Sequence, residues 1–286
     1  MREKLARAIR EVLEEGKAQA ALFLVEKDGK LLPHLAHDAS DPDIEEAYTG
    51  DRRFAMSAFT AIALPGVEGK VAVVGRECDR RMMNELAKLN HLDLDRVLLL
   101  GLPCSQELAD ACGCDHPVPP EPVAETDVSP APGPAREEGE GEASAAGRLE
   151  YWLEHFSRCI RCYGCRNSCP LCVCKDCAIE REELVGTGSY PPDIPIFHII
   201  RALDMADRCI DCGMCVLSCP ADIPLRELYR GVREAFKDIF GYEPGLSPEE
   251  KSPMTFLGEP ADNNLAALLT GLGVEREPAE VSATLL

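Results

Sequence analysis

Residues 159–170 read CIRCYGCRNSCP, and residues 209–220 read CIDCGMCVLSCP. Both stretches follow the pattern C-x2-C-x2-C-x3-C-P. Three thiolates separated by two residues each can wrap one face of a cubane in a tight loop, while the fourth thiolate points away. This spacing is typical of ligands to four-iron four-sulfur (4Fe–4S) clusters, and the chain carries it twice.

The fourth cysteine of each motif is expected to serve the neighbouring cluster, as it does in proteins that hold two such clusters. This crossed arrangement would tie the two motifs together, so that cluster binding and folding become one process. The proline after each fourth cysteine fixes the backbone as it leaves the cluster. The predicted ligand sets are Cys159, Cys162, Cys165 and Cys219 for the first cluster, and Cys209, Cys212, Cys215 and Cys169 for the second.

Zinc and disulfide bonds are weaker interpretations of these cysteines. Zinc sites usually pair two C-x2-C units across a gap, whereas each motif here places four cysteines in one short run. Disulfides need an exported protein, and residues 1–7, MREKLAR, form a charged start without the apolar segment of a signal peptide. We therefore expect a cytoplasmic protein, in a reducing compartment where thiolates stay available for metal.

The net charge of −20 at pH 7 argues against nucleic acid as a partner, because phosphates repel an acidic surface. Such a surface either suits transient docking on a basic redox partner or serves solubility alone. Apolar runs such as residues 97–100 are far too short to cross a bilayer, so no membrane span is expected.

Residues 1–115 carry the pattern of an α/β domain. Two continuous apolar runs, at 71–75 and 97–102, flank a helical pattern, so they predict a parallel βαβ unit within a three-layer domain. Residues 28 and 29, Asp-Gly, predict a hairpin turn between two earlier strands. The expected elements are helices at 1–18, 54–64 and 79–89 and strands at 20–26, 31–36, 71–75 and 97–102.

The turn after the strand at 71–75 reads GRECDRR over residues 75–81. A helix N-terminus favours anions, so Arg76, Cys78 and Arg80 are candidate cofactor-binding residues around a phosphate. The support from chemistry alone is weak, because the turn has neither a glycine-rich dinucleotide fingerprint nor a P-loop lysine. Cys78 is either a reactive thiol with a pKa lowered by the helix start or a buried structural cysteine.

Residues 71–80, VAVVGRECDR, and residues 92–104, LDLDRVLLLGLPC, resemble the beta subunits of deazaflavin-reducing hydrogenases and formate dehydrogenases. The resemblance covers roughly residues 20–115. It implies a subunit that carries iron–sulfur clusters and, in many members, FAD, and that passes electrons between a metal enzyme and a flavin or deazaflavin. The chain departs from this pattern after Cys104, so FAD is the secondary expectation, behind two 4Fe–4S clusters.

Residues 116–147 are rich in Pro, Glu, Ala and Gly, so they are expected to form a disordered linker. Cysteine motifs set between predicted helices resemble the all-helical ferredoxin domain of succinate dehydrogenase iron–sulfur subunits and of the C subunit of heterodisulfide reductase. The helices expected after the linker span 149–156, 194–206, 224–239 and, in the tail, 265–272. The expected divisions are an α/β domain at 1–115, the linker at 116–147, a helical dicluster domain at 148–242 and a tail at 243–286.

Two groups of cysteines lie outside the motifs. They are Cys104, Cys112 and Cys114 in one group and Cys172, Cys174 and Cys177 in the other. The first group either ligates a metal with one more cysteine or consists of plain reduced thiols, which its spacing favours. The second group either holds a further metal, with its fourth ligand from the first group, or shields a cluster or contacts a partner.

Two clusters held close together form a path for electrons, and no nucleophile–base pair indicates another catalytic role. We therefore expect an iron–sulfur electron-transfer subunit of an anaerobic oxidoreductase complex. The expected partners are the subunits of a hydrogenase, a formate dehydrogenase or a heterodisulfide-reductase-like enzyme. The alternative is a flavin- or deazaflavin-dependent oxidoreductase subunit whose N-terminal domain carries hydride transfer.

Overall fold

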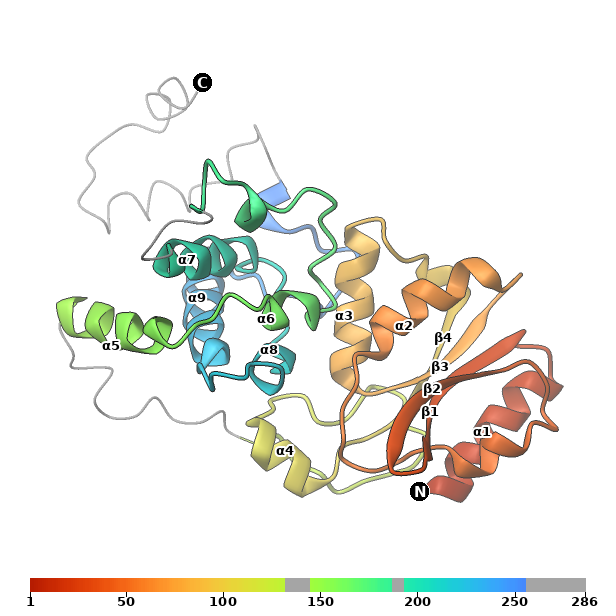
Figure 1. Ribbon diagram of the computed structural model, residues 1–286. Coiled ribbons are helices and arrows are strands. Elements are labelled where there is room, and N and C mark those ends of the chain that lie inside the picture. Colours follow the sequence, from red (N-terminus) through yellow and green to blue (C-terminus); the bar gives the residue numbers. More distant parts are fainter. Residues whose placement is uncertain (132–144, 187–192, 256–286) are drawn as a thin grey trace.

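The chain folds into an N-terminal half built on a sheet and a C-terminal half built of helices (Figure 1). The computed structural model describes residues 1–131, 145–186 and 193–255. The strands are β1 (Ala20–Lys27), β2 (Lys30–Ala36), β3 (Val71–Gly75) and β4 (Val97–Gly101). The α-helices are α1 (Arg2–Glu14), α2 (Met56–Ala63), α3 (Glu77–Lys88), α4 (Gln106–Cys112), α5 (Ala145–Ser157), α6 (Gly164–Asn167), α7 (Ile194–Asp204), α8 (Met214–Leu217) and α9 (Leu225–Phe240). Short 3-10 helices span Pro42–Glu46, Leu64–Gly66, Leu94–Arg96, Ala178–Glu180 and Pro253–Thr255.

The sheet has the strand order β2-β1-β3-β4. β1, β3 and β4 are parallel, and β2 pairs antiparallel with β1 through the predicted two-residue turn. Asp28 and Gly29 both have positive φ, 52° and 72°, which matches the right-handed twist of the flanking strands. The predicted parallel βαβ unit is confirmed as β3-α3-β4, with Val71 opposite Val97.

Helices cover both faces of the sheet, which confirms the expected three layers. On one face, Leu5 and Ile9 of α1 pack in a cluster with Phe23 of β1. On the other face, side chains of α2 and α3, among them Met82, pack in a cluster with Val73 of β3. The central strands β1 and β3 have continuous apolar runs and are buried on both faces, as expected within a parallel sheet, whereas the edge strand β2 is partly exposed.

The C-terminal half is helical, since the described residues after 144 contain helices and no strand. Its core gathers aromatic and aliphatic side chains from α5, α7 and α9, including Phe156, Phe197 and Tyr229. The two buried motif cysteines Cys165 and Cys215 belong to the same cluster of side chains. The cysteine motifs are therefore part of the core around which these helices pack.

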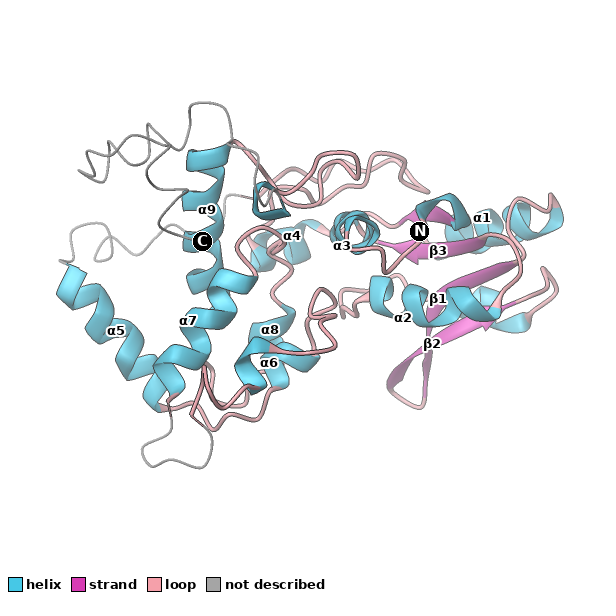
Figure 2. Ribbon diagram, turned by 90° about the horizontal axis from the view of Figure 1, so that it is seen from above, coloured by secondary structure: helices cyan, strands magenta, loops and turns pink. Residues whose placement is uncertain are grey.

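The two halves share a hydrophobic core, which the sequence did not reveal. Leu171, Met205 and Ile210 of the helical half join the same cluster as Met82 and Leu86 of α3. Both views place α3 between the sheet and the helical half (Figure 1, Figure 2). The contact between the halves is thus made by packed side chains and does not depend on a tether alone.

Residues 116–131 pack against the sheet and so differ from the expected disordered linker. The amide of Val123 donates to the carbonyl oxygen of Gly101, and Pro122 forms a parallel bridge with Gly101 beside β4. A Cβ at Gly101 would lie 2.6 Å from the carbonyl oxygen of Glu121, so glycine is what permits this approach. A composition rich in Pro and Ala indicates disorder, because it offers few large apolar side chains to bury. Along the edge of a sheet, however, a few small side chains are enough to hold a segment in place. Residues 145–147 of the predicted linker begin α5 instead, while its residues 132–144 and the predicted helix at 265–272 lie outside the described residues.

Membrane insertion of a helix is not supported by the described residues. Among their helices, none combines the length and the hydropathy that a bilayer crossing requires.

Candidate metal centres

The two cysteine motifs adopt the same local backbone structure. The residue before the second cysteine has positive φ in both motifs, 50° at Arg161 and 62° at Asp211. The residue after the second cysteine does so as well, 58° at Tyr163 and 73° at Gly213. Residues other than glycine rarely adopt this conformation, so its recurrence at matched positions indicates the same geometric demand in both loops.

These left-handed turns direct backbone amides toward the thiol sulfurs. In the first motif, the amide of Arg161 donates to Cys159 Sγ at 3.4 Å, and that of Gly164 donates to Cys162 Sγ at 3.5 Å. In the second motif, the equivalent amides of Asp211 and Met214 donate to Cys209 and Cys212. Amide hydrogen bonds to sulfur favour the thiolate form and help to set the reduction potential of a bound cluster.

One cavity brings cysteines of both motifs together. Cys219 belongs to the second motif, yet it lines this cavity with the three leading cysteines of the first motif. The ends of the motifs also meet, because the hydroxyl oxygens of Ser168 and Ser218 lie 2.8 Å apart. The structure therefore gathers the predicted first ligand set, Cys159, Cys162, Cys165 and Cys219.

Three cysteines of the second predicted set, Cys209, Cys212 and Cys215, lie near one another. Cys212 and Cys215 each interact electrostatically with Cys209. Cys169 packs against the same apolar cluster as Cys209 and Cys212. Burial raises the pKa of Cys212 and of Cys215 to about 12, because a thiolate is unfavourable in an apolar site. A metal ion reverses this preference, since a coordinating thiol loses its proton.

Buried donors near the first cavity fit an anionic sulfur cluster. His198 is 1% exposed and lines the cavity, and its ring stacks on that of Phe156 with the two ring centroids 4.5 Å apart. Within the described residues, neither of its ring nitrogens has a hydrogen-bond partner, and the same holds for Arg201 Nε and the Tyr229 hydroxyl. Unpaired buried donors are costly, and the sulfide ions of a cluster would supply acceptors.

Arg201 carries a buried positive charge between the motifs. It is 3% exposed, and its guanidinium donates to Cys172 Sγ at 2.8 Å and to the carbonyl oxygen of Cys165 at 2.9 Å. Burial and the Arg201 charge together lower the pKa of His198 to about 4, so this ring is neutral at pH 7. A neutral imidazole can donate one hydrogen bond, and a buried guanidinium can balance the negative charge of a cluster.

The second group of extra cysteines occupies a cavity of its own. Cys172, Cys174 and Cys177 line it together with Arg208 and Asp204. The expected fourth ligands, Cys104, Cys112 and Cys114, line a different cavity. The structure does not bring the two groups together, because the triplet packs beside α7 whereas the other group follows β4.

The three candidate anion-binding residues of the β3–α3 turn have separate surroundings. The guanidinium of Arg76 donates to the carbonyl oxygens of Gly50 at 2.6 Å and Pro103 at 3.2 Å, and Arg80 pairs with Glu77 at 2.6 Å. Of the two alternatives for Cys78, the structure contradicts the reactive thiol with a lowered pKa, because burial raises the pKa of this thiol well above its usual value. Desolvation there outweighs the favourable field of the helix start. The phosphate site itself stays a prediction.

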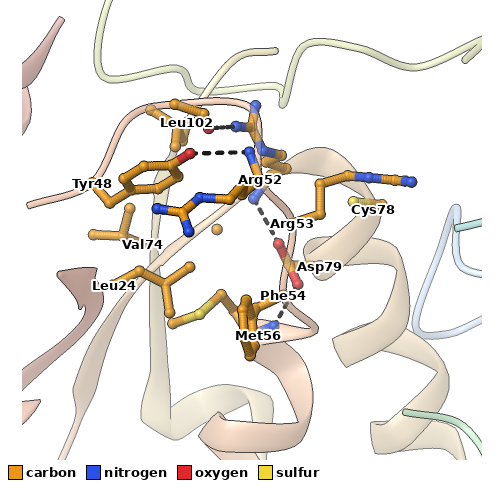
Figure 3. Close-up of a pocket in the computed structure, with 13 residues that line it drawn as sticks. Leu24, Tyr48, Arg52, Arg53, Phe54, Met56, Val74, Cys78, Asp79 and Leu102 are labelled. Atoms are coloured by element: carbon orange, nitrogen blue, oxygen red, sulfur yellow. Dashed lines mark hydrogen bonds between the residues drawn. The ribbon is translucent and has the colours of Figure 1, made fainter. Parts of the chain in front are cut away.

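A pocket lies beside this turn, at the carboxyl end of the parallel strands (Figure 3). It is lined by Tyr48, Arg52, Arg53 and Phe54 from the preceding loop and by Asp79 of α3. In parallel α/β sheets, ligands commonly bind at this edge. Sequence reasoning missed the contribution of residues 48–54, because they lie in a polar loop that carries no motif.

Asp79 closes one side of this pocket and fixes the start of two helices. Its carboxylate accepts from the amides of Met56 at 2.8 Å and Arg76 at 3.0 Å (Figure 3). Burial raises its pKa to about 6, although these hydrogen bonds favour the charged form. The residue therefore anchors the loop of the pocket to α3.

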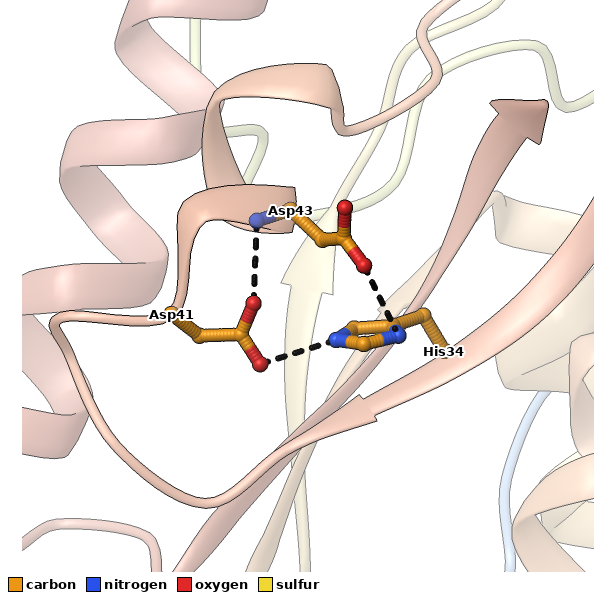
Figure 4. Close-up of side chains that lie close together, drawn as sticks. All are labelled: His34, Asp41 and Asp43. Atoms are coloured by element: carbon orange, nitrogen blue, oxygen red, sulfur yellow. Dashed lines mark hydrogen bonds and ion pairs between the residues drawn. The ribbon is translucent and has the colours of Figure 1, made fainter.

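A histidine and two aspartates meet beside β2 (Figure 4). His34 Nε2 lies 2.9 Å from Asp41 Oδ2, and Asp43 pairs with Lys27 at 2.6 Å. Asp41 also accepts from the amide of Asp43 at 2.9 Å and so caps the 3-10 helix at Pro42–Glu46. Each of the three side chains already interacts with other residues of this chain. These contacts explain the group, because they hold the loop that follows β2 in place.

Comparison with known proteins gives similarity over about a third of the chain. No protein-family model matches. The chain is 42% identical over 98 residues to the F420-dependent formate dehydrogenase subunit beta of Methanocaldococcus jannaschii, which is 34% of this chain and 26% of that protein. It is 40% identical over 101 residues to the F420-dependent formate dehydrogenase 1 subunit beta of Methanococcus maripaludis, which is 35% of this chain and 26% of that protein. The chain thus spans about a quarter of the length of these curated relatives, and the resemblance of its N-terminal region to a formate dehydrogenase beta subunit is confirmed.

Proposed function

We propose that the chain is an electron-transfer subunit with two 4Fe–4S clusters, each ligated by three cysteines of one motif and the fourth of the other. The observation that carries this proposal is the position of Cys219, which lines the cavity of the first motif although it belongs to the second. Crossed fourth ligands are what this spacing produces in two-cluster proteins. Neither separate zinc sites nor reduced thiols would require them.

The residues around each set would hold the cluster and set its properties. A bound 4Fe–4S cluster takes up and releases single electrons. The left-handed loops supply three thiolates and the amide hydrogen bonds to sulfur. His198 and Arg201 supply a hydrogen-bond donor and a positive charge, and Phe156 and Phe197 keep water away from the first cavity. Hydrogen bonding, charge and solvent exclusion are the features that tune cluster potentials.

The α/β half would join these clusters to a redox enzyme. Its curated relatives are subunits of F420-dependent formate dehydrogenase, so the complex we infer is of the hydrogenase, formate dehydrogenase or heterodisulfide-reductase-like kind. This proposal is supported by the packing of Leu171, Met205 and Ile210 in one core with α3, because Cys209 and Cys212 of the second motif pack against the same core. A surface of net charge −20 favours a basic partner surface.

A second candidate function rests on the pocket of Figure 3. Three arginines, Arg52, Arg53 and Arg76, and the ring of Tyr48 line it at the carboxyl end of β3. Positive charge beside an aromatic ring suits an anionic flavin or deazaflavin. On this alternative the α/β half performs hydride transfer, and the clusters supply or remove electrons.

Metal, sulfide and flavin contents of the anaerobically purified chain distinguish these functions. We expect at least about eight iron and eight acid-labile sulfide ions per chain, no stoichiometric flavin, and visible absorption that bleaches when dithionite is added. A colourless preparation, or one with zinc in place of iron, would refute the electron-transfer proposal. Flavin released in a 1:1 ratio would favour the second candidate.

A further inference from the structure

Three arginines of α9 converge on a single aspartate of the second cysteine motif. Arg226, Arg230 and Arg233 are spaced by four and three residues, so they lie on one face of the helix. Their common partner is Asp211, which lies within the loop of the second motif. Given the two clusters of the proposed function, on which this inference rests, we propose that the three α9 arginines raise the reduction potential of the second cluster above that of the first.

The contacts between these arginines and Asp211 are largely shielded from water. Arg226 Nε donates to Asp211 Oδ1 at 2.6 Å, and Arg230 Nη2 donates to Asp211 Oδ2 at 2.7 Å. Arg233 Nη2 lies 3.7 Å from the same Oδ2, and the four side chains are between 10% and 18% exposed. Among the residues that the structure describes, none of the three arginines pairs with another carboxylate. Three positive charges therefore share one negative charge, which leaves two of them unbalanced.

The second motif is the place where an anion would balance these charges. Arg233 interacts electrostatically with Cys209, and Arg226 does so with Cys212. Arg53 of the α/β half adds a further positive charge, because its guanidinium donates to the carbonyl oxygen of Cys212 at 2.6 Å. A cluster with four thiolate ligands is negative and becomes more so when it accepts an electron. Positive charge beside it therefore favours the reduced form and raises the potential.

The first motif has less unbalanced positive charge around it. Of the two arginines inside this motif, Arg166 pairs with Glu180 at 3.2 Å, whereas Arg161 acts on Cys159. Arg201 lies between the motifs and acts on cysteines of both, so its charge does not distinguish them. The balance of fixed charge thus favours reduction of the second cluster.

Exposure to water differs between the motifs in the opposite sense. Ile160 and Ile210 directly follow the first cysteine of each motif, and they are 70% and 4% exposed. Water stabilises the more negative reduced form, so burial alone would make the second cluster the harder one to reduce. At an effective dielectric constant of about 20, one unit charge at about 10 Å changes an equilibrium by about tenfold. We expect the two unbalanced charges to outweigh the difference in hydration.

The resulting order of potentials gives electron transfer a direction. The first motif reaches the surface at Ile160 and at the exposed Cys162, whereas Cys209 and Cys212 pack against the core shared with α3. An electron received at the surface would leave the first cluster, which is oxidised, as the second is reduced, and no bond is made or broken. The α9 arginines would then hold this electron at the contact between the two halves.

Redox titration of the full chain, loaded anaerobically with iron and sulfide and followed by EPR, tests this inference. The two signals are assigned by their loss in Cys162→Ser and Cys212→Ser. At any one potential, the ratio of reduced to oxidised second cluster should exceed that of the first by at least about tenfold, which is about 59 mV for a one-electron couple. Arg233→Gln removes a charge and only the longest contact with Asp211, so it should lower the ratio of the second cluster about tenfold and leave that of the first nearly unchanged.

Three further variants separate an effect of charge from an effect on structure. Asp211→Asn removes the negative charge and keeps the shape, so it should raise the ratio of the second cluster about tenfold. Arg233→Lys keeps the charge and should match the unmodified chain. Lys237→Gln is the control, because this side chain lies one turn further along α9 but is 57% exposed, and water and salt screen its charge. A purely structural role would not shift the potential in opposite directions in Arg233→Gln and Asp211→Asn.

The outcomes separate this inference from the proposed function. Two clusters of which the second has the lower potential would overturn the role of the α9 arginines and leave the electron-transfer proposal intact. Lower stability of Arg233→Gln and Asp211→Asn with unchanged potentials would show that the arginines only hold the loop, which also overturns it. A preparation without iron would refute the proposed function and, with it, this inference. If Arg233→Gln loses its iron, the order of the two potentials in the unmodified chain still decides.

Discussion

Replacing Cys219 with Ser is expected to remove the cluster at the first motif, while the cluster at the second motif keeps its iron. Cys219 follows α8, among the residues of the second motif, but it lines the cavity of the first. Without its thiolate, the first set retains three cysteines and loses the link that joins the two motifs. We expect a loss of about four iron ions per chain. Because Cys165 and Cys215 belong to the core of the helical half, a lower thermal stability should accompany the loss.

EPR spectra of three reduced variants identify which cluster is lost. The signal missing from Cys219→Ser should match the signal missing from Cys162→Ser, a ligand of the first set. It should differ from the signal missing from Cys212→Ser, a ligand of the second set. Cys169→Ser tests the reverse exchange: the EPR signal missing from this variant should match the signal missing from Cys212→Ser. If Cys219→Ser instead matches Cys212→Ser, each motif ligates its own cluster and the crossed arrangement is wrong.

Glu85→Ala is expected to destabilise the contact between α3 and residues 241–255. Glu85 is 2% exposed and accepts from the amide of Gly245 at 2.6 Å, from Lys88 Nζ at 2.8 Å and from the Tyr242 hydroxyl at 3.3 Å. Truncation leaves the Lys88 ammonium without its carboxylate and the Gly245 amide without an acceptor. Removing one partner of a buried charged pair typically costs about 3–5 kcal/mol.

Denaturant unfolding of the cluster-loaded chain measures this cost, and limited proteolysis locates it. We expect earlier cleavage within residues 241–255 in Glu85→Ala, and a smaller effect in Glu85→Gln, which keeps an acceptor oxygen. Glu11→Ala is the matched control, because Glu11 forms an exposed ion pair with Arg7 at 3.7 Å and should matter little. An unfolding free energy of Glu85→Ala within about 0.5 kcal/mol of the unmodified chain would show that the segment is not held in this way.

The elements that sequence reasoning predicts are those set by local patterns. The Asp28–Gly29 turn favours a two-residue hairpin, and the apolar runs of β3 and β4 favour buried parallel strands. The repeated motif spacing predicted that Cys219 would join the first motif, and the structure places it in that cavity. In each case the residues that decide the outcome are close in sequence or repeat a known spacing.

The features that escaped prediction depend on contacts between distant segments. The sequence pattern puts Cys78 in an anion-binding turn, whereas its position beside the same cavity as Cys104 follows only from the adjacency of β3 and β4. Leu171, Met205 and Ile210 have no periodicity that distinguishes a contact with α3 from an ordinary helical core. Such contacts are set by three-dimensional packing, which a single sequence does not display.

Anomalous diffraction at the iron absorption edge, from crystals grown without oxygen, tests the central claim most directly. The proposal predicts iron density surrounded by Cys159, Cys162, Cys165 and Cys219, and a second site surrounded by Cys209, Cys212, Cys215 and Cys169. Iron density bonded to all four cysteines of a single motif would contradict the crossed arrangement. Anomalous signal at the zinc edge and none at the iron edge would contradict the electron-transfer function itself.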